Sequence, residues 1–363
     1  MNRKGICYDV GCVMDGNWRP IFDPEVIHRE LGIIRDDLHC NAVRICGLDI
    51  DRLTTSAGDA LEQGLEVWLS PLLWDKGPDE TLAYITKAAS AAEALHRQWP
   101  DRLVLSVGSE LTLFMQGIVP GRSVTQRMRH PSFVETVKAG RHNPPLNAFL
   151  GRANEAVRRV FHGPLTYASL VWEEVDWSLF DFVGIDHYRA ARIRDSYLDM
   201  LRPAFGHGKP VVITEFGSRT YQGADTTTEG MGGDLVDPTP NLRVALVYLT
   251  NMLRMRLFGT QLPPPRLPLK PGNYVRDEAT QAREIVDVLA LLDQTGVDGA
   301  FVSTFISPTA YYDPDPRRDL DMNGYGLVKS YAAGHGATYP DMTWEPKQAF
   351  SAVAEFYAGH PDR

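Results

Sequence analysis

The sequence alternates between short apolar runs and longer amphipathic stretches along almost its whole length. Runs rich in Val, Ile and aromatic residues are typical of buried strands, and apolar residues at helical spacing indicate helices between them. Regular alternation of the two predicts parallel strands joined by crossover helices. We identify eight such runs: GICYDV, NAVRICG, EVWLSPLL, LVLSVGSE, LTYASL, FVGIDHY, PVVITEF and GAFVSTFI. Eight β/α units predict an α/β fold of the closed (β/α)8 barrel type.

Four of the intervening stretches have recognisable helix ends. The stretch 23–38 begins at Asp23, which can cap a helix N-terminus, and Pro24 takes the first helical position. Acidic residues in the first turn of a second stretch oppose the helix dipole, and a third stops at a glycine. We therefore predict helices over 23–38, 77–99, 143–163 and 276–296.

Two connections are too long for a minimal barrel. One spans about 111–142, between the fourth strand and its helix, and the other spans about 217–274 and contains an expected helix over 239–259. Both follow strands, so we expect them on the carboxyl-terminal face, where barrel active sites are built. Loops of this length usually carry function or disorder. No internal repeat divides the chain, which predicts one domain over 1–363.

The composition is that of an ordinary soluble globular protein, with 44% hydrophobic and 23% charged residues. A formal net charge of -9 argues against a nucleic-acid groove or an anionic membrane surface as partner. No apolar run approaches a membrane span, and no signal-peptide core follows the first residues. We therefore expect a cytoplasmic protein. No sequence feature indicates an oligomeric state.

Several other site types lack their sequence signals. The four cysteines form no C-x2-C pair, so buried thiols are favoured over zinc, and the first strand has no H-x-H motif. No G-x-S-x-G elbow and no G-x-G-x-x-G fingerprint occur. The acidic run 313–324 lacks calcium-loop spacing and is expected to be a solvated loop. We therefore expect neither a metal nor a cofactor. The cysteines are Cys7, Cys12, Cys40 and Cys46.

Two strand ends carry a glutamate. Glu110 ends the fourth apolar run and Glu215 lies at the end of the seventh. A single glutamate at a strand end often only faces solvent, but two on these strands would converge on one cleft at the barrel mouth. Two carboxyl groups about 5–5.5 Å apart are the working pair of a retaining glycosidase. The pair therefore predicts an active site of that kind.

At these residues the chain resembles the superfamily of retaining glycoside hydrolases with glutamates after strands four and seven, over nearly its whole length. The resemblance implies that Glu110 is the acid/base and Glu215 the nucleophile. NAVRICG is similar to the N-x-V-R of that group, which implies that Arg44 approaches the nucleophile. GIDHY offers His187 and Tyr188, where the group often places an aromatic hydroxyl. The chain also looks similar to bacterial barrel proteins sometimes labelled abortive infection proteins.

The chain departs from this pattern at two places. Ser109 stands where the group has an asparagine that binds the sugar 2-hydroxyl, and Thr304 and Phe305 stand where a strand-eight tryptophan is usual. Two other tryptophans, Trp74 and Trp172, lie beyond strand ends, where aromatic rings can stack on sugars. These departures weaken the prediction of the substrate more than that of the fold.

Several of these candidate residues also have a purely structural interpretation. A buried arginine can simply bond strand-end carbonyls, a strand histidine can be satisfied in the core, and most tryptophans are core residues. The main hypothesis is a glycosidase acting on a small-molecule or oligosaccharide substrate by double displacement. One alternative is a barrel that binds a carbohydrate or glycosylated metabolite without cleaving it. Another is a lyase or rearrangement enzyme of small-molecule biosynthesis.

Overall fold

The computed structural model describes residues 1–14, 16–226 and 272–360, with positions 235, 246, 249–250, 253–254, 256–258 and 269–270 between them. The helix expected over 239–259 lies largely outside the described residues. The prediction of one domain over 1–363 stays a prediction.

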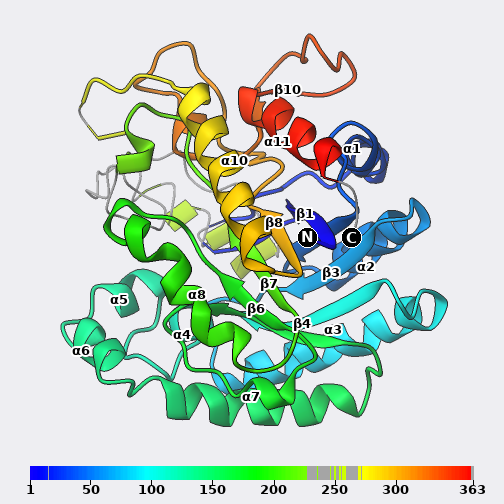
Figure 1. The fold of residues 1–363 in the computed structure, drawn as a ribbon, viewed down its shortest axis with the longest axis vertical. Helices are drawn as coiled ribbons and strands as arrows, with labels where there is room; N and C mark the ends of the chain where they lie inside the picture. The colour runs from blue at the N-terminus through cyan, green and yellow to red at the C-terminus, as the bar shows by residue number, and fades with distance from the viewer. Residues whose placement is uncertain are drawn as a thin grey trace.

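Eight parallel strands close into a barrel, each paired with its neighbours in chain order and the last with the first (Figure 1). This confirms the (β/α)8 fold. The strands read as continuous apolar runs because helices cover one face and the barrel interior covers the other. They are β1 (Arg3–Asp9), β2 (Ala42–Gly47), β3 (Glu66–Pro71), β4 (Leu103–Ser109), β5 (Leu165–Leu170), β6 (Val183–Asp186), β7 (Val211–Phe216) and β8 (Gly299–Val302).

Helices surround the barrel, and the four predicted over 23–38, 77–99, 143–163 and 276–296 are present. Asp23 caps the first helix by accepting a hydrogen bond from the Glu25 amide at 3.0 Å, as its position predicts. The third predicted helix ends at Arg158, before Gly163. The long helices are α1 (Pro24–Asp36), α2 (Ile50–Glu62), α3 (Pro78–Gln98), α7 (Asn143–Arg158), α8 (Tyr197–Phe205), α10 (Glu278–Thr295) and α11 (Gln348–Gly359). Helices α3 and α7 lie side by side, as do α10 and α11 (Figure 1).

Side chains fill the inside of the barrel. One buried cluster joins residues of six different strands, which meet only if they point inward. Its members are Cys7, Ala42, Trp68, Val104, Val212 and Phe301. The lower barrel is therefore a packed core, and only its mouth is left to form a site.

The closing segment of the described chain packs against its beginning. Strands β9 (Val328–Ser330) and β10 (Trp344–Pro346) pair antiparallel and lead into α11. The indole of Trp344 donates to Glu30 at 2.8 Å, and the Tyr357 hydroxyl donates to the Gly5 carbonyl at 3.0 Å. Both side chains are buried, so each is worth about 3–5 kcal/mol against truncation to alanine. The segment therefore holds β1 and α1 in place.

Both long insertions follow the strands predicted to carry them. Between β4 and α7 lie the short helices α4 (Leu111–Phe114), α5 (Val124–Met128) and α6 (Phe133–Lys138). Between β7 and α10, the described residues include the short 3-10 helix η3 (Ala224–Thr226) and helical positions at 246, 249–250, 253–254 and 256–258. The described parts of both insertions thus leave the barrel at the carboxyl-terminal ends of β4 and β7.

The expectation of a solvated loop over 313–324 is wrong for its second half. Asp319 and Asp321 are buried, and they accept hydrogen bonds from Arg276 at 2.8 and 2.6 Å. Lys347, also buried, lies 2.8 Å from Asp321. Each carboxylate here has a cationic partner, which offsets the desolvation cost of burying it. The sequence alone does not show these partners, because they are distant along the chain.

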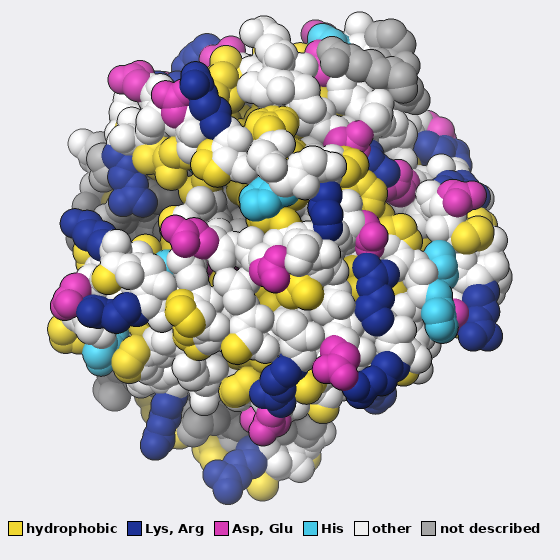
Figure 2. All heavy atoms as spheres, turned by 60° about the horizontal axis from the view of Figure 1, so that its bottom comes forward, with side chains coloured by type: hydrophobic (Ala, Val, Ile, Leu, Met, Phe, Trp, Pro, Cys, Tyr) yellow, Lys and Arg dark blue, Asp and Glu magenta, His cyan; other side chains and the backbone are white. Residues whose placement is uncertain are grey.

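The remaining surface and thiol predictions can be compared with the described residues. All four cysteines are free and buried, which confirms the prediction of buried thiols. On the described part of the face in Figure 2, Lys and Arg side chains are interspersed with Asp and Glu and form no continuous basic area. Among the described helices, none has the length and apolar character needed to span a membrane.

Candidate active site

Three carboxylates meet at the carboxyl-terminal ends of β4, β6 and β7. Glu110, Asp186 and Glu215 each contribute one carboxylate oxygen, and these three oxygens lie within 4.8 Å of one another. The two glutamates are those that the sequence singles out. Asp186 is an addition, since the sequence analysis did not place it in the site.

Glu110 is held in an unusual backbone conformation. Its φ of 48° and ψ of 43° are left-handed, which costs a residue other than glycine of order 1–3 kcal/mol. The β4–β5 pairing shifts register between Ser106 and Ser109, and such a bulge redirects the side chains that follow it. The Glu110 amide then donates to the Ala168 carbonyl at 2.8 Å. The strand end is therefore bent so that Glu110 turns into the barrel mouth.

A buried network holds the residues after Glu110. The Leu111 amide donates to the Tyr167 hydroxyl at 2.7 Å, and that hydroxyl donates to Glu173 at 3.0 Å. Glu173 also accepts from the Leu170 amide at 2.9 Å and the Thr112 amide at 3.2 Å. Burial raises the pKa of Glu173 to about 6, although these donors oppose the rise. The ends of β4 and β5 are thereby fixed relative to each other.

Glu215 is held by two donors, one on each oxygen. Arg44 from β2 donates to Oε1, and the Tyr188 hydroxyl donates to Oε2 at 2.8 Å. Arg44 is fully buried and its Nε donates to the Ser70 hydroxyl at 3.0 Å. The side chain of Glu215 keeps 23% of its surface exposed. It is thus an oriented carboxylate with one open side.

Asp186 lies next to Glu215 because the β6–β7 pairing shifts register at this point. Ile185 pairs with Ile213, but Asp186 pairs with Glu215, which leaves Thr214 as the extra residue. The Thr214 hydroxyl donates to Asp186 Oδ1 at 2.6 Å. The Ser109 hydroxyl donates to Oδ2 at 3.1 Å. Asp186 is therefore fixed by the neighbouring strand β7 and, across the barrel mouth, by Ser109 at the end of β4.

The cluster carries more negative charge than its single contacting arginine balances. Burial, and then the charges of Asp186 and Glu215, raise the pKa of Glu110 well above its ordinary value. Burial and the Glu215 charge raise the pKa of Asp186 to about 7. Glu110 is only 4% exposed, and its Oε2 has no hydrogen-bond partner among the described residues. The same holds for Nη2 of Arg44. Two buried polar atoms thus point to a ligand with both donors and acceptors.

Two of the residues named from the sequence are enclosed by protein. His187 stacks on Tyr197 with ring centroids 4.0 Å apart and its Nε2 bonds the Tyr197 carbonyl at 2.9 Å. Burial lowers its pKa to about 4, so the ring is neutral. Phe305 is fully buried and packs on Tyr8 and Trp344. Neither side chain has a free face in this structure.

Three others lie around the mouth. The Thr304 hydroxyl donates to the Cys7 carbonyl at 2.8 Å, which ties β8 to β1. Trp74 stacks on Phe114 with centroids 4.8 Å apart, and its indole nitrogen is buried without a partner among the described residues. Trp172 is half-buried against the same apolar cluster. The two tryptophans therefore share one aromatic wall formed by the loops after β3, β4 and β5.

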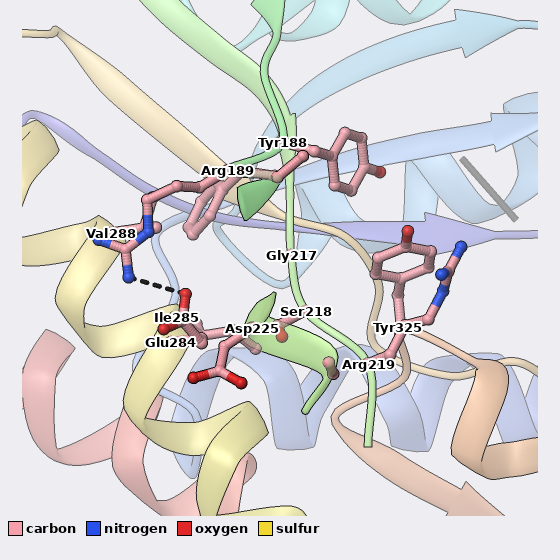
Figure 3. A pocket seen from close by; sticks show the side chains of 13 residues that line it. Tyr188, Arg189, Gly217, Ser218, Arg219, Asp225, Glu284, Ile285, Val288 and Tyr325 are labelled. Atoms are coloured by element: carbon pink, nitrogen blue, oxygen red, sulfur yellow. Dashed lines mark hydrogen bonds and ion pairs between the residues drawn. The ribbon is translucent and has the colours of Figure 1, made fainter. Parts of the chain in front are cut away.

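A hollow lies directly beside Tyr188. It measures about 470 Å³, counting space open to solvent, and Tyr188, Gly217 and Tyr325 are among its lining residues (Figure 3). Tyr188 and Tyr325 have ring centroids 5.3 Å apart. On the other side of the hollow, Arg189 donates to Glu284 at 2.8 Å, which is the dashed line in Figure 3. The hollow thus adjoins the tyrosine that orients Glu215.

Three clustered carboxylates could also hold a metal ion. Oxygen ligands of Mg²⁺ and Ca²⁺ lie at about 2.0–2.6 Å, and such sites are built around the ion's charge. Here Arg44 already supplies a positive charge to Glu215, and two hydroxyls donate to Asp186. Because Arg44 already balances one carboxylate, a divalent ion would bring more positive charge than the remaining carboxylates need. This donor set therefore fits a divalent ion poorly, and the absence of a metal stays a prediction.

Comparisons with known proteins give a fold but no family. No family model matches the sequence, and no curated protein matches it. Among solved structures, the chain is similar to a GH113 β-mannanase from Alicyclobacillus acidocaldarius, with 14% identity, a TM-score of 0.57 and 98% and 97% of the two chains covered. It is also similar to another GH113 β-1,4-mannanase, with 13% identity, a TM-score of 0.56 and 99% of both chains covered.

A third similar structure is a β-glucuronidase from Bacteroides uniformis, with 16% identity and a TM-score of 0.53. That match covers 98% of this chain but only 35% of the glucuronidase, which is a much longer protein. At identities this low the likeness concerns the backbone. The chain therefore shares the (β/α)8 barrel fold of these glycoside hydrolases.

Proposed function

We propose that the protein is a retaining glycoside hydrolase in which Glu215 is the nucleophile and Glu110 the general acid/base. The observation that carries the proposal is the meeting of the two glutamates, with a carboxylate oxygen of each no more than 4.8 Å apart. Retaining enzymes separate these groups by about 5–5.5 Å, and inverting enzymes leave room for a water molecule with about 6.5–9.5 Å. The short separation favours direct attack by one carboxylate.

The environments of the two glutamates support different roles. Glu215 receives hydrogen bonds from Arg44 and Tyr188, which stabilise its ionised form. Burial and neighbouring charges raise the pKa of Glu110, which keeps that group protonated and able to donate. Glu215, held by two donors, suits the nucleophile, and Glu110, kept protonated, suits the acid.

In the proposed reaction Glu215 attacks the anomeric carbon while Glu110 transfers its proton to the leaving oxygen. The glycosidic bond breaks and a glycosyl ester forms on Glu215. Glu110, now ionised, takes a proton from water, whose oxygen attacks the anomeric carbon and releases Glu215. Water is the only co-reactant. The left-handed Glu110 backbone and the Tyr167–Glu173 network hold the acid in place throughout.

Substrate contacts follow from polar atoms without a protein partner and from half-buried rings around the mouth. We propose that Arg44 Nη2 and Ser109 face the sugar and that Trp74 and Trp172 offer ring faces. We leave His187 and Phe305 out of this set because protein contacts enclose both side chains.

The test uses aryl glycosides of different sugars with the wild type and two variants. On any substrate that the wild type cleaves, Glu215→Ala and Glu110→Gln should each lower kcat by at least ~10²-fold. Glu355→Gln, an exposed glutamate of α11, is the matched control and should retain full activity. Wild-type turnover in both site variants would overturn the proposal.

A further inference from the structure

Asp186 has no part in the proposed reaction, although it is buried beside both working carboxylates. The double displacement needs one nucleophile and one acid/base, and Asp186 is a third acidic group that is only 2% exposed. Burying an ionisable group costs free energy unless it has a partner. Two hydroxyls hold it, but neither carries a positive charge. A cation from outside the chain would complete this site.

The spacing of the three carboxylates fits a nitrogen cation. Three oxygens no more than 4.8 Å apart share a point at most 4.8/√3, or about 2.8 Å, from each, which is the length of a charge-assisted N–H···O bond. An ammonium group has three N–H donors, one for each oxygen. A hydroxyl has one. The buried Oε2 of Glu110, which has no partner among the described residues, is a further sign that a ligand group belongs in this site.

The charge count also fits. With Glu110 holding its catalytic proton, the site contains two carboxylates, Glu215 and Asp186. Arg44 contacts Glu215 and balances one of them. An ammonium on the substrate would balance the other and leave the site neutral. Burial and the Glu215 charge raise the pKa of Asp186 to about 7 although Arg44 opposes the rise, and an added cation would lower this pKa.

The position of the ammonium follows from the reaction. The nucleophilic oxygen must come to roughly 3–3.5 Å from the anomeric carbon. A substituent on the adjacent ring carbon is then close to Glu215 and within reach of Asp186, whereas substituents across the ring are farther away. We therefore propose that the enzyme selects glycosides of 2-amino-2-deoxy sugars with a free ammonium, and that Asp186 is the specificity residue that binds it.

Binding of the ammonium by Asp186 would also stabilise the transition state. Positive charge develops at the anomeric carbon, next to the ammonium, and the two repel each other. A carboxylate at Asp186 offsets that repulsion more strongly as the charge grows, which is differential stabilisation of the transition state. The inference rests on the proposed function, but it concerns which substrate is selected, and a separate experimental outcome would contradict it.

The experiment compares nitrophenyl glycosides that differ only at the second ring carbon. Each of the gluco, galacto and manno series supplies a 2-amino, a 2-hydroxy and a 2-acetamido member. In the series that the wild type cleaves, kcat/KM should be at least about tenfold higher for the 2-amino glycoside. Asp186→Asn should abolish this preference, whereas Asp101→Asn, an exposed aspartate, should keep it. Thr214→Val removes one of the two hydroxyl donors to Asp186 and should reduce the preference for the 2-amino glycoside. This variant replaces Asp186→Asn in the test if Asp186→Asn does not fold.

Binding supplies a second readout. Calorimetry with methyl 2-amino-2-deoxy glycosides and their 2-hydroxy counterparts should show the same order. Equal or better cleavage of the 2-hydroxy glycosides contradicts the inference and leaves the proposed function standing. Preferred binding of the amino glycosides without cleavage of any substrate contradicts the proposed function and leaves the ammonium site standing. Absence of both cleavage and preferential binding contradicts both.

Discussion

The hydroxyl of Ser109 donates a hydrogen bond to Oδ2 of Asp186 at 3.1 Å. Ser109 stands where the resembled superfamily has an asparagine. Asp186 is the carboxylate of the cluster that was not predicted for the site. The serine hydroxyl, with that of Thr214, orients the aspartate. The departure and the additional acid are thus two parts of one arrangement.

Arg44→Met should destabilise the fold and reduce activity together. Removing one partner of a buried ion pair costs about 3–5 kcal/mol, and the partial exposure of Glu215 places the expected loss near the lower end. Urea denaturation measures this loss. Ser70→Ala removes only the contact to Arg44 Nε and should cost about 1 kcal/mol. Equal, small losses in both variants would show that the Arg44–Glu215 pair contributes little.

Tyr188→Phe should reduce activity with little change in stability. The hydroxyl donates to Glu215 at 2.8 Å, and a hydrogen bond to a charged group contributes about 1.5–3 kcal/mol. We expect kcat/KM to fall by roughly 10- to 100-fold. Tyr325→Phe, a change in the neighbouring ring, is the comparison. A Tyr188→Phe enzyme with wild-type kcat/KM would remove this tyrosine from the account of the nucleophile.

The pH dependence of activity should depend on Asp186. The charges facing Glu110 are Asp186, Glu215 and Glu173, which raise its pKa, and Arg44, which lowers it. Activity falls as the pH rises through this pKa, because the acid is lost. Asp186→Asn removes one of the raising charges, so the alkaline limb of kcat/KM should move to lower pH. An unchanged or higher alkaline limb would contradict the assignment of Glu110 as the acid.

Stability should respond to pH through the same aspartate. The folded pKa of Asp186 is about 7, against about 3.9 in the unfolded chain. Between these values the native state binds the extra proton, so the contribution of Asp186 to stability is present below about pH 4 and is lost as the pH rises toward 7. Wild type should therefore lose free energy of unfolding relative to Asp186→Asn over this window.

Urea denaturation at several pH values between 4.5 and 8 measures that difference. Groups with lowered pKa, such as Asp315 at about 2, titrate in both proteins and cancel in the comparison. A constant difference between the two proteins across the window would mean that Asp186 titrates as an ordinary carboxyl.

The barrel was predictable because its strands are buried on both faces. Each apolar run, from GICYDV to GAFVSTFI, overlaps one of the eight strands. The position of Glu110 and Glu215 at strand ends then follows from counting. What the sequence does not contain is the local backbone: the register shifts beside Ser109 and Asp186 and the left-handed conformation of Glu110 depend on how neighbouring strands pair.

Asp186 itself left a signal. Side chains two residues apart on a strand point to the same face, and neighbouring ones point to opposite faces. If Tyr188 points into the mouth, Asp186 should do so too, and His187 should point away from it. In the structure His187 stacks on Tyr197 of α8, whereas Asp186 joins the carboxylate cluster. Phe305 gives no comparable signal, because its burial depends on Trp344, which lies far along the chain.

The measurement closest to the central claim is mass spectrometry of the protein after reaction with an activated fluoroglycoside. The probe should be a 5-fluoroglycosyl fluoride, which keeps the substituent on the second ring carbon available to Asp186. The account predicts one glycosyl group per chain, attached to Glu215 and absent in Glu215→Ala. A label on Asp186 or Glu110, or rapid turnover to a product of inverted configuration, would contradict it.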